Sequence, residues 1–154
     1  ALAAGAEGNI NYSNEMILRR AALRSDKAVL AALEYAWLAC SDMDPVHDGT
    51  MSFEEYASMS RRLYLVLRME EWNETDDLNF VQAMRRELLI DPQDCLDTIE
   101  EDFAEDAKGK DVITREDFFD CFFQLADLYT EGASATEYAR WIHKRVNEIA
   151  AVYS

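Results

Sequence analysis

The chain has little glycine, proline or positive charge, and each shortage excludes some fold classes or binding partners. Only 5 Gly and 2 Pro occur in 154 residues. A β-rich fold of this size needs many turns, which these residue types supply, so we expect an all-α protein. The 15 Lys and Arg against 31 Asp and Glu leave a formal net charge of −16. Such an acidic chain is expected to bind nucleic acid or an anionic membrane surface poorly, because like charges repel.

Paired cysteines and catalytic motifs are missing as well. The three cysteines, Cys40, Cys95 and Cys121, form no CxxC pair. Free buried thiols in a reducing compartment are therefore expected, rather than a disulfide framework or a zinc site. The sequence contains no Gly-rich phosphate loop and no GxSxG elbow, and neither His47 nor His143 has a nucleophile at a meaningful spacing. We do not expect an enzyme.

No segment is apolar enough over sufficient length to span a bilayer. The longest apolar stretch, 28–40, is interrupted by a glutamate. Residues 1–12 lack the basic and apolar regions of a signal peptide, so a flexible lead-in is expected there. Residues 13–154 are expected to form a single helical domain, with two lobes of about 13–89 and 90–154 as the alternative.

Helical periodicity and capping signals predict seven helices. Their ranges are about 14–23, 26–40, 53–67, 75–89, 92–107, 115–129 and 135–152. The helix at 115–129 is apolar over most of its circumference. We expect it to be the central buried helix, and the alternative is that part of it lines a groove for a partner helix.

Two short β-like pieces, 50–52 and 112–114, each follow a polar loop and precede a helix that opens with acidic residues. The first loop has the spacing of a Ca²⁺ site. Ca²⁺ takes about six to eight oxygen ligands, which a twelve-residue loop supplies from positions 1, 3, 5, 7, 9 and 12, with glycine at position 6. Counting from Asp44 at position 1, the matching residues are Asp48 at 5, Gly49 at 6, Thr50 at 7, Ser52 at 9 and Glu55 at 12.

This segment resembles an EF-hand, the loop family of calmodulin and its relatives. It departs from the family pattern at Val46, which occupies position 3 and removes one carboxylate. An alternative register takes Asp42 and Asp44 as the first two ligands. Both registers imply at most one weak Ca²⁺ site. In paired EF-hands the residues at position 8 meet in a short two-stranded bridge, which implies that Met51 pairs with Ile113.

The second loop begins at Asp106 and ends at Asp117, but Lys108 and Lys110 stand where carboxylates belong. We expect no metal there, and we expect the two ammonium groups to neutralise the loop in part. A third, shorter trace at 127–138 has few possible ligands and is expected to be structural.

Two apolar motifs carry a narrower resemblance. The pattern EEY…M…RLY lies at 54–64, and FxxxFFxLADLYT…EY lies at 118–138. Both resemble degenerate EF-hand proteins of cilia and flagella. The resemblance implies a cytoplasmic protein of the axoneme or a related cytoskeleton.

Charge is unevenly distributed along the chain. The stretch 91–120 contains 12 acids and 3 bases, a net charge of −9. Either this stretch is a solvated face or it docks a basic partner. The basic residues form four pairs, at 19–20, 61–62, 85–86 and 144–145. Three of these pairs lie opposite an apolar face and are therefore expected to be solvated, and the alternative is that one pair binds an acidic surface such as a tubulin tail.

These patterns favour a non-catalytic EF-hand-type protein–protein interaction module, a scaffold or adaptor in a cytoskeletal or ciliary assembly. Its expected partner is a basic or amphipathic helical segment or a cytoskeletal component. The alternative is a Ca²⁺ sensor that exposes an apolar surface when Ca²⁺ binds.

Overall fold

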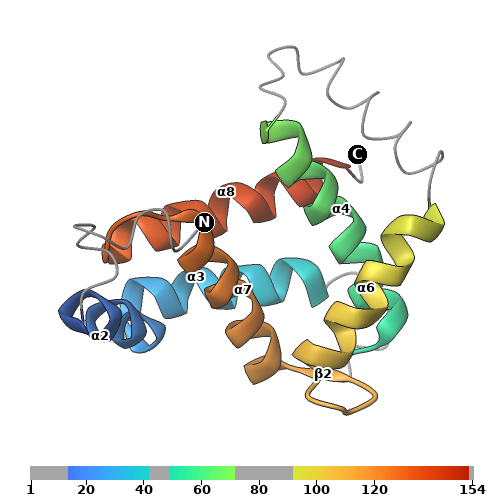
Figure 1. Cartoon of the computed structure of the whole chain (residues 1–154), viewed down its shortest axis with the longest axis horizontal. Coiled ribbons are helices and arrows are strands. Elements are labelled where there is room, and N and C mark those ends of the chain that lie inside the picture. Colours follow the sequence, from blue (N-terminus) through green and yellow to red (C-terminus); the bar gives the residue numbers. More distant parts are fainter. Residues whose placement is uncertain (1–13, 42–48, 72–91, 153–154) are drawn as a thin grey trace.

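A computed structural model describes residues 14–41, 49–71 and 92–152 of the chain. These residues are mostly helical, which confirms the all-α prediction (Figure 1). The elements are α2 (Asn14–Ala22), the 3₁₀ helix η2 (Leu23–Ser25), α3 (Lys27–Ser41), α4 (Phe53–Glu71), α6 (Pro92–Asp106), α7 (Arg115–Tyr129) and α8 (Ala135–Val152). The expected lead-in at 1–12 and the expected helix at 75–89 lie outside the described residues.

Two short strands join the two predicted loop regions. Strand β1 (Thr50–Met51) pairs with β2 (Ile113–Thr114) in an antiparallel sheet. Met51 lies opposite Ile113, which confirms the predicted pairing, and each is only 1% exposed. The bridge therefore connects the start of α4 to the start of α7.

The core lies where α8 packs along α3 and also contacts α4 and α7 (Figure 1). The side chains of α8 that face this core recur at helical spacing, and they are Tyr138, Trp141, Ile142, Val146 and Ile149. From α7, Phe118 stacks on Phe122 with ring centroids 4.8 Å apart and meets Trp37 of α3 edge-on. Burial of these rings confirms α7 as a central buried helix along one side.

The basic pairs are less solvated than expected. Arg20 is 13% exposed at its side chain, and Arg145 only 4%. Arg145 donates to Glu148 Oε1 at 3.0 Å and its guanidinium lies over the Trp141 ring. The expectation of solvation was wrong for these two residues because each guanidinium finds an acidic partner and an aromatic ring within the fold. Their sequence neighbours, Arg19 and Lys144, are exposed.

Candidate functional site

The first predicted loop is described from Gly49 onward, while Asp44 and Asp48 lie outside the described residues. Gly49 has a φ of 81°, the left-handed conformation that a sharp turn at position 6 requires. Ser52 and Glu55 form a reciprocal pair at the start of α4. The Ser52 amide donates to Glu55 Oε1 at 2.9 Å, and the Glu55 amide donates to Ser52 Oγ at 3.2 Å.

This pair is a capping box, which satisfies two backbone donors at the helix start. Thr50 lies in β1 opposite Thr114. Within residues 14–41, 49–71 and 92–152, no three acidic, histidine or cysteine side chains gather closely enough to hold a metal ion. Of the predicted ligands, Thr50 lies in β1, and Ser52 and Glu55 bond to each other in the capping box that opens α4.

The first residues of the second predicted loop form the C-terminal end of helix α6. Helix α6 closes with a Schellman motif, in which the Gly109 amide donates to the Ala104 carbonyl and the Lys108 amide to the Glu105 carbonyl. Lys108 and Gly109 both have positive φ, at 55° and 82°. The left-handed residues thus lie at loop positions 3 and 4, whereas the first loop has its left-handed glycine at position 6. The second loop therefore differs from a cation-binding loop in its backbone conformation and also in its side chains.

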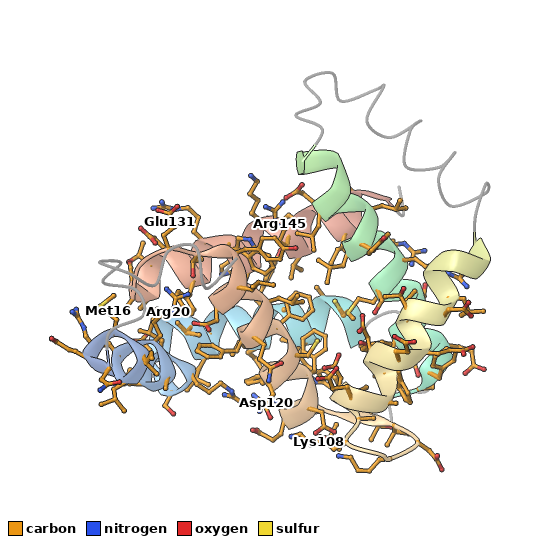
Figure 2. The ribbon with its side chains drawn as sticks, in the orientation of Figure 1. Met16, Arg20, Lys108, Asp120, Glu131 and Arg145 are labelled. Atoms are coloured by element: carbon orange, nitrogen blue, oxygen red, sulfur yellow. The ribbon has the colours of Figure 1, made fainter. Side chains whose placement is uncertain are left out.

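Two ammonium groups converge on the carboxylate of Asp117. Lys110 Nζ lies 2.5 Å from Asp117 Oδ2, and Lys108 Nζ lies 3.3 Å from Oδ1 and 3.1 Å from Asp120 Oδ2 (Figure 2). The Asp117 side chain is 4% exposed and also caps α7, because its Oδ2 accepts from the Thr114 amide at 3.0 Å. The expected neutralisation of this loop by its own lysines is therefore present.

These contacts change the ionisation of the loop. Burial alone would raise the pKa of Asp117, but hydrogen bonds from Lys110, Thr114 and Lys108 outweigh burial and hold the pKa far below its usual range. Hydrogen bonds to Asp120 and then Asp117 raise the pKa of Lys108. The loop therefore holds a charged carboxylate between charged ammonium groups at neutral pH, and its residues do not fit a divalent cation.

The first acid of that loop has a different partner. Asp106 Oδ2 accepts a hydrogen bond of 2.6 Å from the Tyr56 hydroxyl, so the carboxylate ties α6 to α4. Burial, followed by the nearby Cys121 and Asp106, raises the pKa of Tyr56 far above its usual range. Sequence reasoning assigned Tyr56 only to a motif and missed this contact, which joins residues separated by 50 positions.

The third loop-like segment, 127–138, binds the guanidinium of Arg20. Arg20 Nε donates to Asp127 Oδ1 at 2.9 Å, and its Nη atoms donate to the backbone carbonyls of Asp127, Thr130, Glu131 and Gly132. The Tyr138 hydroxyl also donates to Asp127. Arg20 and Glu131 lie at the end of the molecule where α2 meets the start of α8 (Figure 2). The expectation of a structural role is met by an arginine that caps the end of α7, a role that sequence reasoning did not assign.

A groove lies between α4, α6 and α7, on the side of α7 away from the buried phenylalanines. It encloses a cavity of about 320 Å³ with an apolar lining and an acidic edge. Its apolar residues are Met59, Leu63, Leu67, Ile99, Leu125 and Leu128, and its acids are Asp102, Glu105 and Asp106. Leu128 is 68% exposed. Helix α7 is therefore buried in the core on one side and lines a groove on the other.

No protein-family model, curated protein or solved structure matches the chain. Among the helices in the described parts of the chain, none combines the length and the apolar character that crossing a membrane would require.

Proposed function

We propose that the chain is a non-catalytic EF-hand-type protein–protein interaction module that keeps its fold without bound metal. The observation that carries this proposal is the convergence of Lys108 and Lys110 on Asp117 beside the Met51–Ile113 pair. In this arrangement the ammonium groups supply the positive charge that a bound cation would bring to the loop. The bridge between the two loops is formed with that charge already in place.

On this proposal the module is a scaffold or adaptor, and the motifs at 54–64 and 118–138 favour a ciliary or other cytoskeletal assembly in the cytoplasm. The first loop remains as at most one weak Ca²⁺ site. The left-handed Gly49 and the carboxylate of Glu55 favour the second candidate function, a Ca²⁺ sensor. In a sensor, Glu55 would leave its helix-capping contact to bind the ion, and α4 would move relative to α3.

Calorimetric titration with Ca²⁺ at low salt, beside the Glu55→Gln variant, separates the two functions. The scaffold predicts little or no heat and unchanged Trp fluorescence when Ca²⁺ and then a chelator are added. Trp37 is a suitable reporter because it lies on α3, next to Phe118 of α7. Strong binding that Glu55→Gln abolishes, together with a change in Trp emission, would establish the sensor instead.

A further inference from the structure

We propose that the groove between α4, α6 and α7 binds an amphipathic helix of a partner protein, with Lys or Arg on the side of that helix that faces α6. The proposal rests on the proposed function as an interaction module and names the site and chemistry of the interaction. Helix-in-groove recognition uses apolar anchors from one face of the bound helix, and charged contacts at the edge set its orientation.

The first argument is the apolar lining. Leu128 is 68% exposed and Tyr64 is 44% exposed, although both line a cavity whose other walls are largely apolar. Large exposed apolar side chains gathered around a cavity mark an interaction surface, whereas single exposed leucines are ordinary. A cavity of about 320 Å³ has room for one or two large apolar side chains of a bound helix.

The second argument is a contrast between the acids of α6 and those of α7. In α7 the acidic residues have internal cations. Glu116 and Asp120 pair with Arg24, and Asp117 and Asp127 pair with Lys110 and Arg20. Ion pairs within the fold therefore already neutralise much of the negative charge of α7.

Four acids of α6 differ from those of α7 in this respect. Within the described residues, no Lys or Arg forms an ion pair with the exposed side chains of Glu100, Glu101, Asp102 or Glu105. Partial burial, followed by the charges of Asp106, Glu105 and Glu101, raises the pKa of Asp102. Acids so close together on one helix repel one another until a cation approaches. Two of the four, Asp102 and Glu105, line the apolar groove. This complementarity specifies a basic partner rather than an acidic or neutral one.

The test uses a synthetic peptide of about 18 residues, roughly 27 Å long as a helix, with Leu and one Trp on one face and Lys on the other. The peptide carries a terminal fluorophore, and binding to the full chain is followed by anisotropy, in chelator and again with Ca²⁺. A peptide with Glu in place of Lys and a peptide with the same residues in scrambled order serve as controls. Both controls should bind at least about tenfold more weakly than the Lys peptide.

Protein variants locate the binding surface. Leu128→Glu should lower affinity for the Lys peptide about tenfold or more, and Asp102→Asn with Glu105→Gln should lower it severalfold. Leu18→Glu is the matched control for the first change, because Leu18 is 71% exposed on α2 and lies outside the groove. Glu15→Gln with Glu137→Gln is the matched control for the charge change. Circular dichroism confirms that each variant is folded.

Equal losses in the groove variants and their controls would overturn the proposal, because binding would then depend on net charge alone. Absence of binding in both conditions would overturn it too. Binding only with Ca²⁺ would keep the groove and overturn the metal-independent scaffold, so the two proposals can fail separately.

Two further outcomes would assign a different occupant and would also overturn the proposal. A dimer in sedimentation velocity that Leu128→Glu dissociates would place a second copy of the chain in the groove. Peptide binding that emerges only when residues 72–91 are replaced by a Gly/Ser segment of equal length would place that part of the chain there.

Discussion

Met51 faces Ile113 across the antiparallel bridge, and each side chain is 99% shielded from solvent. Truncation at this pair removes buried contacts from the strands that precede α4 and α7 at once. Ile113→Ala should lower the free energy of unfolding by about 2 to 5 kcal/mol, measured by urea denaturation. Val112→Ala, at a half-buried neighbour, is the control and should cost less. Combining Ile113→Ala with Met51→Ala should give a coupling energy of about 0.5 kcal/mol or more. Simple additivity would mean that the two side chains do not support each other.

Removing the contact of Lys110 with Asp117 should destabilise the second loop in the absence of any metal ion. Lys110→Met keeps most of the aliphatic stem but leaves Asp117 with fewer partners for its buried charge. Because Lys110 is 45% exposed, the expected loss is modest, about 1 kcal/mol in the free energy of unfolding. Lys27→Met, at an exposed lysine on α3, should change stability little. If the two variants are equally stable, the Lys110 contact contributes nothing measurable.

Acid should weaken the fold through Asp117. Its pKa is lower in the folded chain than in the unfolded chain, so its contribution to stability is fully present above the unfolded-state value of about 3.9. That contribution is lost as the pH falls through this value toward the lower folded-state pKa. Asp117→Asn should therefore unfold more easily at neutral pH and lose less stability on acidification than the parent chain. Glu54→Gln, at an exposed position in the first turn of α4, is the matched control and should follow the parent curve.

Arg20 should hold α2 in place. Arg20→Met removes five hydrogen bonds, four of them to backbone carbonyls, and α2 buries no side chain of its own. The local opening free energy of α2 should fall by about 2 to 3 kcal/mol, read as faster amide hydrogen exchange in residues 14–22. Arg19→Met is a close control, since Arg19 is exposed and, within the described residues, its side chain donates a hydrogen bond to the Met16 sulfur alone. Similar exchange in both variants would contradict the role assigned to Arg20.

Local signals made much of the fold predictable. Periodicity and caps located the helices of the described residues, and the resemblance of the two loops to paired EF-hands implied the Met51–Ile113 pair. Burial of Arg20 was not predictable, because its partners lie 107 to 112 residues away and only the tertiary fold brings them together. The end of α6 was predicted within one residue, but its Schellman motif was not predicted. Its Lys108–Gly109 pair fits a helix C-terminus as well as a loop, and the count of loop positions assigned it to the loop.

The candidate site was predictable in part for the same physical reasons. Lys108 and Lys110 were expected to neutralise the second loop in part, since they occupy loop positions 3 and 5, where a cation loop has carboxylates. The contact of Tyr56 with Asp106 had no local signature, because a tyrosine after two glutamates also fits an ordinary core helix. The groove depends on how three helices splay apart, which pairwise sequence spacing does not encode.

The contacts of Arg20 also limit the order in which the helices can dock while the chain is being translated. Helix α2 is translated long before the carbonyls at 127–132 that receive its guanidinium. A nascent chain that ends before residue 132 therefore carries α2 without the full set of hydrogen bonds that Arg20 makes in the complete fold. Docking of α2 can follow only after α7 has left the ribosome, so the N-terminal helix of the described structure is among the last to be secured.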